Sequence, residues 1–358
     1  MAGIRAVSLL KQRALNAVAW ALHHFGVLYL WRRFRPYNGV KVLAYHSIQK
    51  AAFTRRLLGT GMGPDQFAAQ IRFLAKNYHI ISIDHALAVA TGETPCPANA
   101  VALSFDDGYL DTAEQAAPLL REHSLSAAVF TATGCIDGRC GMWTDDLVYW
   151  IDHTAEQRVS ITMSSGEVRQ FSLAGCARGA AVFQLREWLK RLPARERLDA
   201  LVQISGQLGA KGLTARAEMP FMSPSDVRQL AESGWIVGSH SDTHPILTSL
   251  EPEELERELT ASRELITAWT GSPPVHFAYP NGGDGDVDDA VIAALINAGF
   301  RAGWMFVRGR VVAGSDPYRL PRVGLFDMPL HRFALEMSGM LEVFTTRREP
   351  PRRSSPRR

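Results

Sequence analysis

From Val40 onward the sequence alternates short apolar, β-rich runs with stretches of helical periodicity, and this alternation limits the fold more than any other feature. Eight runs are typical of buried strands: Val40–His46, His79–Ile83, Val101–Phe105, Ala127–Thr131, Trp235–Ser239, Val275–Tyr279, Phe300–Phe306 and Arg319–Leu325. Helical patterns lie between several of them, over Gly63–Asn77, Thr112–Glu122, Ser223–Glu232, Pro252–Thr270 and Val287–Ala298. Strands that alternate with helices form a parallel sheet, and eight of them predict an α/β barrel over residues 40–345.

The interval 144–220 interrupts this alternation. Its pattern predicts a helix, a hairpin around Ser164–Glu167 (SSGE) and a long helical stretch broken at Pro193. We therefore expect an inserted α+β segment that covers or shapes one side of the barrel mouth. After it, "SPSD" at Ser223–Asp226 combines a serine N-cap, a proline at the first helical position and an acidic residue at the third, which predicts a helix start.

Residues 1–39 differ from this central region. Their apolar run, Leu15–Trp31, has basic residues on both sides and is about 17 residues long, near the lower limit for crossing a bilayer. Because it contains Asn16, His23 and His24, it is a poor transmembrane helix. Two interpretations remain open: a helix lying in the membrane interface, and a helix packed on the domain. The run ends without a small-residue cleavage site, so we expect an uncleaved, inner-membrane-associated protein on the cytoplasmic side.

The residues that make the chain basic lie near the other end of the sequence. The net charge is +3, but Arg347–Arg358 carries six arginines and one glutamate, which leaves the rest of the chain near −2. Residues 346–358 are predicted to be a disordered tail that could contact anionic lipid or nucleic acid, with a plain solvated terminus as the alternative. For the protein as a whole we expect no nucleic-acid partner. Of the four cysteines, only Cys135 and Cys140 are close enough in sequence for a local disulfide, with free thiols as the alternative.

Two acidic residues follow the third apolar run. "VALSFDDGY" places Asp106 and Asp107 directly after Val101–Phe105, where the carboxyl end of a parallel strand carries an active site. Adjacent carboxylates are costly there unless a positive charge lies beside them, and a metal ion would supply it. An N-cap residue with a solvated neighbour is the structural alternative.

Two histidines follow the fifth run. In "WIVGSHSDTHPIL", the i,i+4 spacing of His240 and His244 lets both imidazoles face one point, although such a pair alone is more often a turn feature. Together with one carboxylate they would make a two-histidine, one-carboxylate site with open positions for water and substrate. His46, Arg322 and the "FAYPNGG" turn fall at the same end of the predicted barrel.

"SFDDGY" and "HSDTH" resemble the first and second motifs of the polysaccharide deacetylases with a NodB-homology domain, the fourth carbohydrate esterase family. The order of elements from Val40 to Phe326 is similar too. The resemblance implies an irregular (β/α) barrel that removes N- or O-acetyl groups from glycans with a divalent metal, for which we expect Zn²⁺. It further implies that Asp106 is the general base and that Asp107, His240 and His244 bind the metal.

The family's third motif resembles "YPNG" and implies that a backbone N–H at Asn281 stabilises the oxyanion. The candidate substrate-binding residues are Tyr109, Ser241, Tyr279 and Pro280. Ser241 is either a contact for nearby groups or an anion, or a plain turn serine.

The sequence departs from the family at two places. Ala278 stands where an arginine usually braces the base, and no C-terminal motif supplies the general acid. "LAYHSI" resembles the N-terminal segment of the subgroup that deacetylates exported poly-N-acetylglucosamine, which implies that His46 is the acid. Arg322 could take over the brace. The alternative for His46 is a strand-end histidine that hydrogen-bonds only to the backbone, and the alternative for Arg322 is an ordinary surface ion pair.

Four other residues receive structural interpretations. We expect Trp143 and Trp150 to be core residues rather than platforms for a sugar ring, His276 to point away from the mouth, and Asp111 to cap the following helix.

The leading hypothesis is a metal-dependent deacetylase of an N-acetylated glycan or lipid-linked sugar in exopolysaccharide or cell-envelope biosynthesis. Two alternatives stay open, which are a deformylase or other amide hydrolase on an amino sugar, and a catalytically silent glycan-binding member of the fold. The retained base and ligand set argue against a silent binder. The oligomeric state is not predicted.

Overall fold

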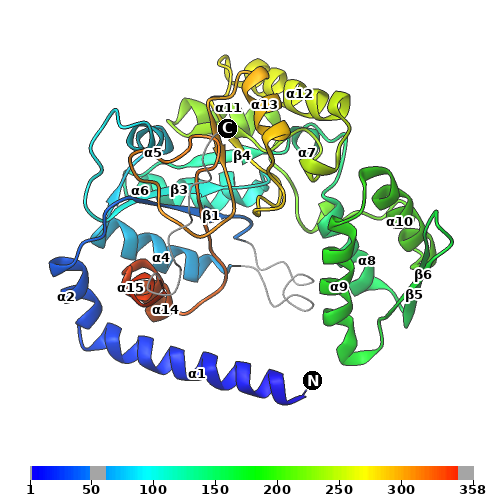
Figure 1. The fold of residues 1–358 in the computed structure, drawn as a ribbon, viewed down its shortest axis with the longest axis horizontal. Helices are drawn as coiled ribbons and strands as arrows, with labels where there is room; N and C mark the ends of the chain where they lie inside the picture. Colours follow the sequence, from blue (N-terminus) through cyan, green and yellow to red (C-terminus); the bar gives the residue numbers. More distant parts are fainter. Residues whose placement is uncertain (1, 49–61, 346–358) are drawn as a thin grey trace, which may run out of the picture.

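The computed structural model describes residues 2–48 and 62–345, and in these ranges the predicted barrel is present (Figure 1). Its strands form a parallel sheet in the order β10-β1-β3-β4-β7-β8-β9, with β2 paired to the start of β3. The strands are β1 (Val40–Tyr45), β2 (His79–Ile80), β3 (Ala100–Phe105), β4 (Ala128–Thr131), β7 (Ile236–Ser239), β8 (His276–Ala278), β9 (Ala302–Trp304) and β10 (Val323–Gly324). Each of the eight predicted runs therefore contains a strand.

The curled sheet closes through the chain segment around β10. On one side Leu320 donates its N–H to the Gly303 carbonyl at 3.0 Å and accepts from Met305 at 2.8 Å. On the other side β10 pairs in parallel with β1, and the Leu325 N–H reaches the Ala44 carbonyl at 3.0 Å. The last predicted strand thus joins the two edges of the sheet, which makes the irregular (β/α) barrel.

Alternate strand residues line the interior, as the two-residue period of a strand requires. They are small or apolar and form one buried cluster: Val40, Val42, Ala100, Ala102, Ala128, Phe130, Ala278, Ala302 and Trp304. The same cluster includes one face of α5 (Ile83–Ala90), a helix that the sequence did not predict. The run predicted as strand to Ile83 ends at Ile80 instead, because Ser82 caps α5 by accepting from the His85 N–H at 3.1 Å.

Helices cover the outside of the sheet. They are α4 (Pro64–Asn77), the π-helical turn Thr112–Ala116 with α6 (Ala117–Glu122), α7 (Thr133–Ile136), α11 (Pro224–Glu232), α12 (Pro252–Thr270), α13 (Asp289–Asn297), α14 (Leu330–Met337) and α15 (Met340–Thr345), with short 3₁₀ turns at Ala215–Ala217 and Leu247–Ser249. The predicted start of α11 is confirmed, since Ser223 and Asp226 form a capping box with proline at the first turn. The last two helices were not predicted.

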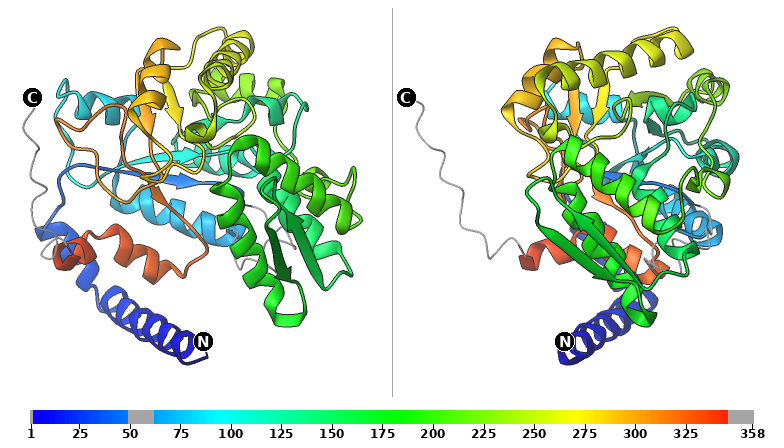
Figure 2. Two further views of the ribbon diagram at one scale, coloured as in Figure 1. Left: turned by 45° about the vertical axis from the view of Figure 1, so that its right-hand side comes forward. Right: turned by 90° about the vertical axis from the view of Figure 1, so that its right-hand side faces the viewer.

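The inserted segment forms a lobe beside the barrel (Figures 1 and 2). It consists of α8 (Trp143–His153), an antiparallel hairpin of β5 (Arg158–Thr162) and β6 (Val168–Ser172), a 3₁₀ turn (Gly175–Ala177), α9 (Arg178–Lys190) and α10 (Ala194–Gln207). The hairpin and the break at Pro193 were both predicted. Cys135, on α7, and Cys140, between α7 and α8, are free thiols with sulfurs 3.6 Å apart, so the local disulfide is not formed.

The N-terminal run folds as two helices, α1 (Ala2–His24) and α2 (Val27–Phe34), because Gly26 adopts a left-handed conformation with φ 74°. Leu28 and Ala19 pack against Ala334 and Leu335 of α14. No described helix is long and apolar enough to cross a membrane. The packed-helix interpretation therefore holds for one face of α1 and α2, while several large apolar side chains on the other face are exposed. The predicted tail, 346–358, lies outside the described residues.

Candidate active site

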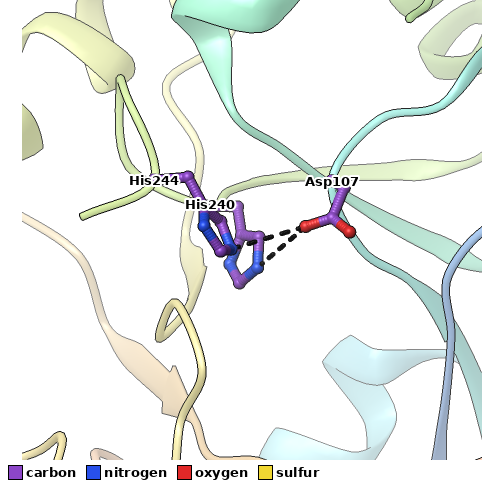
Figure 3. A group of neighbouring side chains, drawn as sticks. All are labelled: Asp107, His240 and His244. Carbon is purple, nitrogen blue, oxygen red and sulfur yellow. Dashed lines mark ion pairs between the residues drawn. The ribbon is translucent and has the colours of Figure 1, made fainter. Parts of the chain in front are cut away.

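Asp107, His240 and His244 bring three potential metal ligands together at the carboxyl ends of β3 and β7 (Figure 3). Nε2 of each imidazole lies 3.5 Å from Oδ1 of Asp107, and the three ligand atoms all lie within 4.8 Å of one another. Donor atoms about 2.1 Å from a tetrahedral zinc ion would be roughly 3.4 Å apart. The spacing of the three side chains therefore fits a shared ion of this kind.

The surroundings of the histidines favour the state that a metal ligand needs. Nδ1 of His240 lies 2.7 Å from the Ala278 carbonyl oxygen, which can only accept, so this nitrogen carries the proton and Nε2 keeps its lone pair. Burial lowers the pKa of His240 to about 4, although the charge of Asp106 opposes the shift. Burial, with the nearby His240 and His46, also lowers the pKa of His244 well below its usual range. Both imidazoles are thus neutral at neutral pH.

Asp107 lies where an isolated carboxylate is unfavourable. Burial raises its pKa well above the ordinary value, and the negative charges of Asp106 and Asp145 raise it further. A divalent cation at this position would reverse the balance, because it stabilises the ionised form of its ligand. The chemical identity of the three donors and the electrostatics around Asp107 therefore both favour a bound divalent cation.

Backbone strain is concentrated in the loops that carry these residues. Asp107 (φ 71°), Ser241 (φ 65°), His244 (φ 59°) and Asn281 (φ 63°) all adopt the left-handed region, which is unfavourable for residues with a Cβ and is concentrated at functional sites. Gly108 has φ 83° as well, and a Cβ there would lie 2.7 Å from the Ile136 side chain. The "DDG" turn thus needs its glycine.

Polar side chains that the sequence did not single out hold the histidine loop. Asp242 accepts from the Thr133 hydroxyl at 2.6 Å and from both terminal nitrogens of Arg139 at 2.8 and 2.6 Å. Buried Glu258, on α12, accepts from the N–H groups of Asp242 and Thr243 at 2.9 and 2.8 Å. Asp242 is visible within "HSDTH", but nothing in the sequence distinguishes Glu258 from the other acidic residues of its helix.

Asp106 forms a buried bidentate pair with Arg322. The Arg322 Nη1 and Nη2 atoms lie 2.6 and 2.9 Å from Oδ1 and Oδ2, and the two side chains are 0% and 2% exposed. Burial alone would raise the pKa of Asp106, but the charge of Arg322, with smaller effects from the neighbouring His240 and His46, lowers it to about 2. Arg322 thus occupies the bracing position that the sequence assigned to it, and the carboxylate is ionised at neutral pH.

His46 and Asn281 line the same cavity as these residues. The His46 ring meets Phe306 edge to face at 5.5 Å, and burial lowers its pKa. Asp111 does not cap the following helix as predicted: its Oδ2 accepts from the Ser47 hydroxyl at 2.7 Å and the Ile48 N–H at 2.8 Å. It instead binds the loop directly after His46.

The four predicted substrate-binding residues differ in position. Tyr109 and Tyr279 line the cavity, but their hydroxyls donate to Asp145 at 2.6 Å and to the Tyr318 carbonyl at 2.8 Å. Ser241 is buried and is not among the residues that line the cavity. Its hydroxyl accepts from the His244 N–H at 3.0 Å. Pro280 is also buried outside the cavity wall. Ser241 therefore shapes the loop beneath the ligands.

The cavity has a volume of about 350 Å³, and the insertion forms part of its wall. Sequence reasoning missed Asp145, Arg186 and Lys190, which line it from α8 and α9. Trp143, expected in the core, packs partly on the core and also lines the cavity, whereas Trp150 bonds the Leu213 carbonyl outside it. His276 points away as predicted and contacts Asp84 at 2.7 Å.

A parallel barrel whose strand ends carry an Asp-His-His set beside a second, braced carboxylate has the architecture of a deacetylase-type hydrolase. Residues 93–303, more than half of the chain, match the family model for polysaccharide deacetylase. The chain belongs to this family.

Solved structures show the same fold. A Streptococcus pyogenes deacetylase, PplD, is 14% identical with a TM-score of 0.56, over 84% of this chain and 99% of that one. IcaB from Ammonifex degensii is 16% identical with a TM-score of 0.54, over 85% and 98%. BC0361, a polysaccharide deacetylase from Bacillus cereus, is 17% identical with a TM-score of 0.50, over 84% and 69%. No curated protein sequence matches the chain significantly.

The Asp106–Arg322 pair makes a prediction about stability. Replacing Arg322→Met leaves a buried, unpaired carboxylate and should lower the free energy of unfolding by about 3–5 kcal/mol. Adding Asp106→Asn should restore much of this loss. Urea unfolding of the chelator-treated protein measures both values.

The matched control is Arg319→Met. Arg319 precedes Arg322 by three residues and forms an exposed ion pair with Asp289. Its cost should be about 1 kcal/mol or less. Additive losses in the double variant would contradict the role given to the buried pair.

Proposed function

We propose that this protein is a metal-dependent deacetylase that removes the N-acetyl group from an N-acetylated glycan or lipid-linked sugar. The observation that carries the proposal is the juxtaposition of two kinds of carboxylate. Asp107 lies 3.5 Å from two neutral imidazoles, and its neighbour Asp106 is ionised and held by Arg322. One carboxylate is thus available as a ligand and the other as a proton acceptor.

A divalent cation, with zinc expected, would be held by Asp107, His240 and His244, and when bound it would polarise the acetyl carbonyl and acidify water. Asp106 is ionised at neutral pH, so it can orient the attacking water and take its proton. The Asn281 N–H donates no hydrogen bond to a described residue and would stabilise the carbonyl oxygen as charge develops. His46 would carry a proton to the leaving amine.

Family membership and the fold support a glycan or sugar substrate. The solved structures with this fold include a deacetylase with bound acetate. Exopolysaccharide or cell-envelope biosynthesis is the setting we propose for the reaction.

The roles of base and ligand can be separated by metal analysis. Asp106→Asn should keep stoichiometric metal and lower turnover by about 10²–10⁴-fold, because the base is lost while the ligands remain. His240→Ala should lose both metal and turnover. Elemental analysis and acetate release, with and without chelator, from a panel of N-acetylated oligosaccharides and lipid-linked sugars measure these effects. Full metal content in His240→Ala would refute the ligand set, and formate in place of acetate would identify a deformylase.

His46 has its own test. His46→Ala should lower turnover by at least about 10²-fold with metal content unchanged, because a proton donor to the leaving group is removed. The matched control is His79→Ala, an exposed histidine that pairs with the opposite, amino end of β3. Wild-type acetate release by His46→Ala would return this residue to a structural role.

We also propose that the outer face of α1 and α2 binds the surface of a membrane with anionic headgroups. Along α1, α2 and the turn between them, the exposed side chains include Trp20 (49%), Phe25 (77%), Tyr29 (59%), Leu30 (51%) and Phe34 (76%). Exposed Arg13 precedes them in the sequence, Arg33 lies among them and Arg35 follows them. Aromatic side chains flanked by arginines suit the headgroup region of a bilayer. The helices lie at the outside of the molecule, at the opposite end from α12 and α13 (Figure 1).

Vesicle sedimentation tests this surface. The full chain should bind vesicles containing anionic phosphatidylglycerol more tightly than vesicles of phosphatidylcholine alone, because arginine charge adds to apolar burial. Replacing Trp20, Phe25 and Phe34 by serine should weaken binding at least about tenfold. Ile296→Ser is the control, because Ile296 is an exposed apolar residue on α13, at 48%. Unchanged binding by the triple variant would remove this surface from consideration.

A further inference from the structure

Two cationic side chains of the insertion face the cavity that holds the Asp-His-His set. Arg186 and Lys190 lie one turn apart on α9, and both line the cavity together with His46, Asp107 and Asp145. Residues four positions apart share a face of a helix. The insertion therefore presents two positive charges to the same space as the reacting groups.

Arg186 lacks a partner among the residues that the structure describes. Its Nε atom is buried without an acceptor, and no hydrogen bond or ion pair joins its guanidinium group to a described residue. Lys190, by contrast, pairs with Glu187 at 3.1 Å, and both of these side chains are partly exposed. A buried, unsatisfied guanidinium nitrogen is unfavourable, so a ligand that supplies an acceptor would stabilise it.

The acidic residues of the cavity do not serve this purpose. Asp145 is close enough to Arg186 for the positive charge to act on its pKa, yet the two side chains form no ion pair. Instead Asp145 accepts from the Tyr109 hydroxyl at 2.6 Å, and burial raises its pKa to about 6. Asp106 is paired with Arg322, and Asp107 faces His240 and His244.

An external oxyanion fits what these two cations offer. A guanidinium group presents a planar fork of donors that matches the oxygens of a phosphoryl group, and a lysine adds a point charge. A phosphate monoester carries about two negative charges, and so does the diphosphate linkage of a lipid-linked sugar, so either makes fuller use of two cations than a single carboxylate does.

We propose that Arg186 and Lys190 form a subsite for a phosphoryl group attached to the N-acetylated sugar, so that the substrate class is a phosphorylated amino sugar. This inference rests on the proposed function, because it places the phosphoryl group beside the site of deacetylation. The phosphate can belong to a sugar phosphate or to the carrier end of a lipid-linked sugar.

Paired substrates test the proposal. N-acetylglucosamine 1-phosphate and methyl N-acetylglucosaminide differ in the anionic group, and the full chain should show a higher kcat/KM for the phosphate. Arg186→Gln should lower kcat/KM for the phosphate by about ten- to a hundredfold, since a hydrogen bond to a charged group is lost. The value for the neutral glycoside should stay within about twofold, and Arg186→Lys should lie between wild type and Arg186→Gln.

Arg191→Gln is the matched control, because Arg191 ends the same helix and is exposed outside the cavity wall. It should change neither substrate's kcat/KM. Equal losses on both substrates in Arg186→Gln, or an equal effect of Arg191→Gln, would overturn the subsite. A preference for N-acetylmuramic acid as strong as for the phosphate would overturn the assignment to phosphoryl. A lipid-linked N-acetylglucosamine diphosphate that outperforms the free sugar phosphate would identify the carrier as the source.

Binding separates this inference from the proposed reaction. Calorimetric titration of the Asp106→Asn chain should give tighter binding of N-acetylglucosamine 1-phosphate than of the neutral glycoside, and adding Arg186→Gln should remove the difference. If wild type releases no acetate from any substrate but this difference persists, the subsite stands and the proposed reaction fails. If acetate is released but Asp106→Asn binds both sugars equally, the subsite fails and the reaction stands.

Discussion

The buried pair of Asp106 and Arg322 is the interaction on which the site depends. It joins the end of β3 to the segment that closes the barrel, and Arg322 also donates to the Met305 carbonyl and the Ser104 hydroxyl at 3.3 Å. Removing two charges from water is unfavourable, so a fully hydrogen-bonded, bidentate geometry is needed to offset that cost. The same contact completes the fold and keeps a carboxylate ionised beside Asp107. Structural closure and catalytic electrostatics therefore share one ion pair.

The barrel and the insertion contribute differently to the cavity. Backbone hydrogen bonds continue past the strands to Asp106 and His240, whose N–H groups reach Tyr45 and Thr131 at 2.9 Å. The reacting groups are therefore fixed by the sheet itself. The insertion reaches the same point through Asp145, which accepts from the Tyr109 hydroxyl at 2.6 Å, and Phe221, directly after the insertion, stacks on the Tyr109 ring at 5.1 Å. Because it is a separate lobe, its residues can differ among barrels of one kind without disturbing the ligands.

Sequence patterns predicted what is local and periodic. The strand runs and the positions of Asp107, His240 and His244 follow from apolar periodicity and from the rule that strand ends share one edge. Glu258, Arg186 and the binding of Asp111 to the loop after His46 depend on how distant segments pack, which spacing along the chain does not encode. Helix α5 was missed because its apolar residues, such as Ile83, read as a continuation of the preceding strand. Arg322 was identified because an expected arginine was absent at Ala278.

Closure of the sheet by its last strand also bears on how the chain is made. Strand β1 is complete at Tyr45, yet its partner at Val323 follows 278 residues later. At a synthesis rate of about 5–20 residues per second, that interval takes roughly 15–60 s. Throughout it, one edge of β1 has unpaired backbone groups, which are a template for association with other chains. A nascent chain of this topology would therefore benefit from a chaperone until β10 emerges from the ribosome.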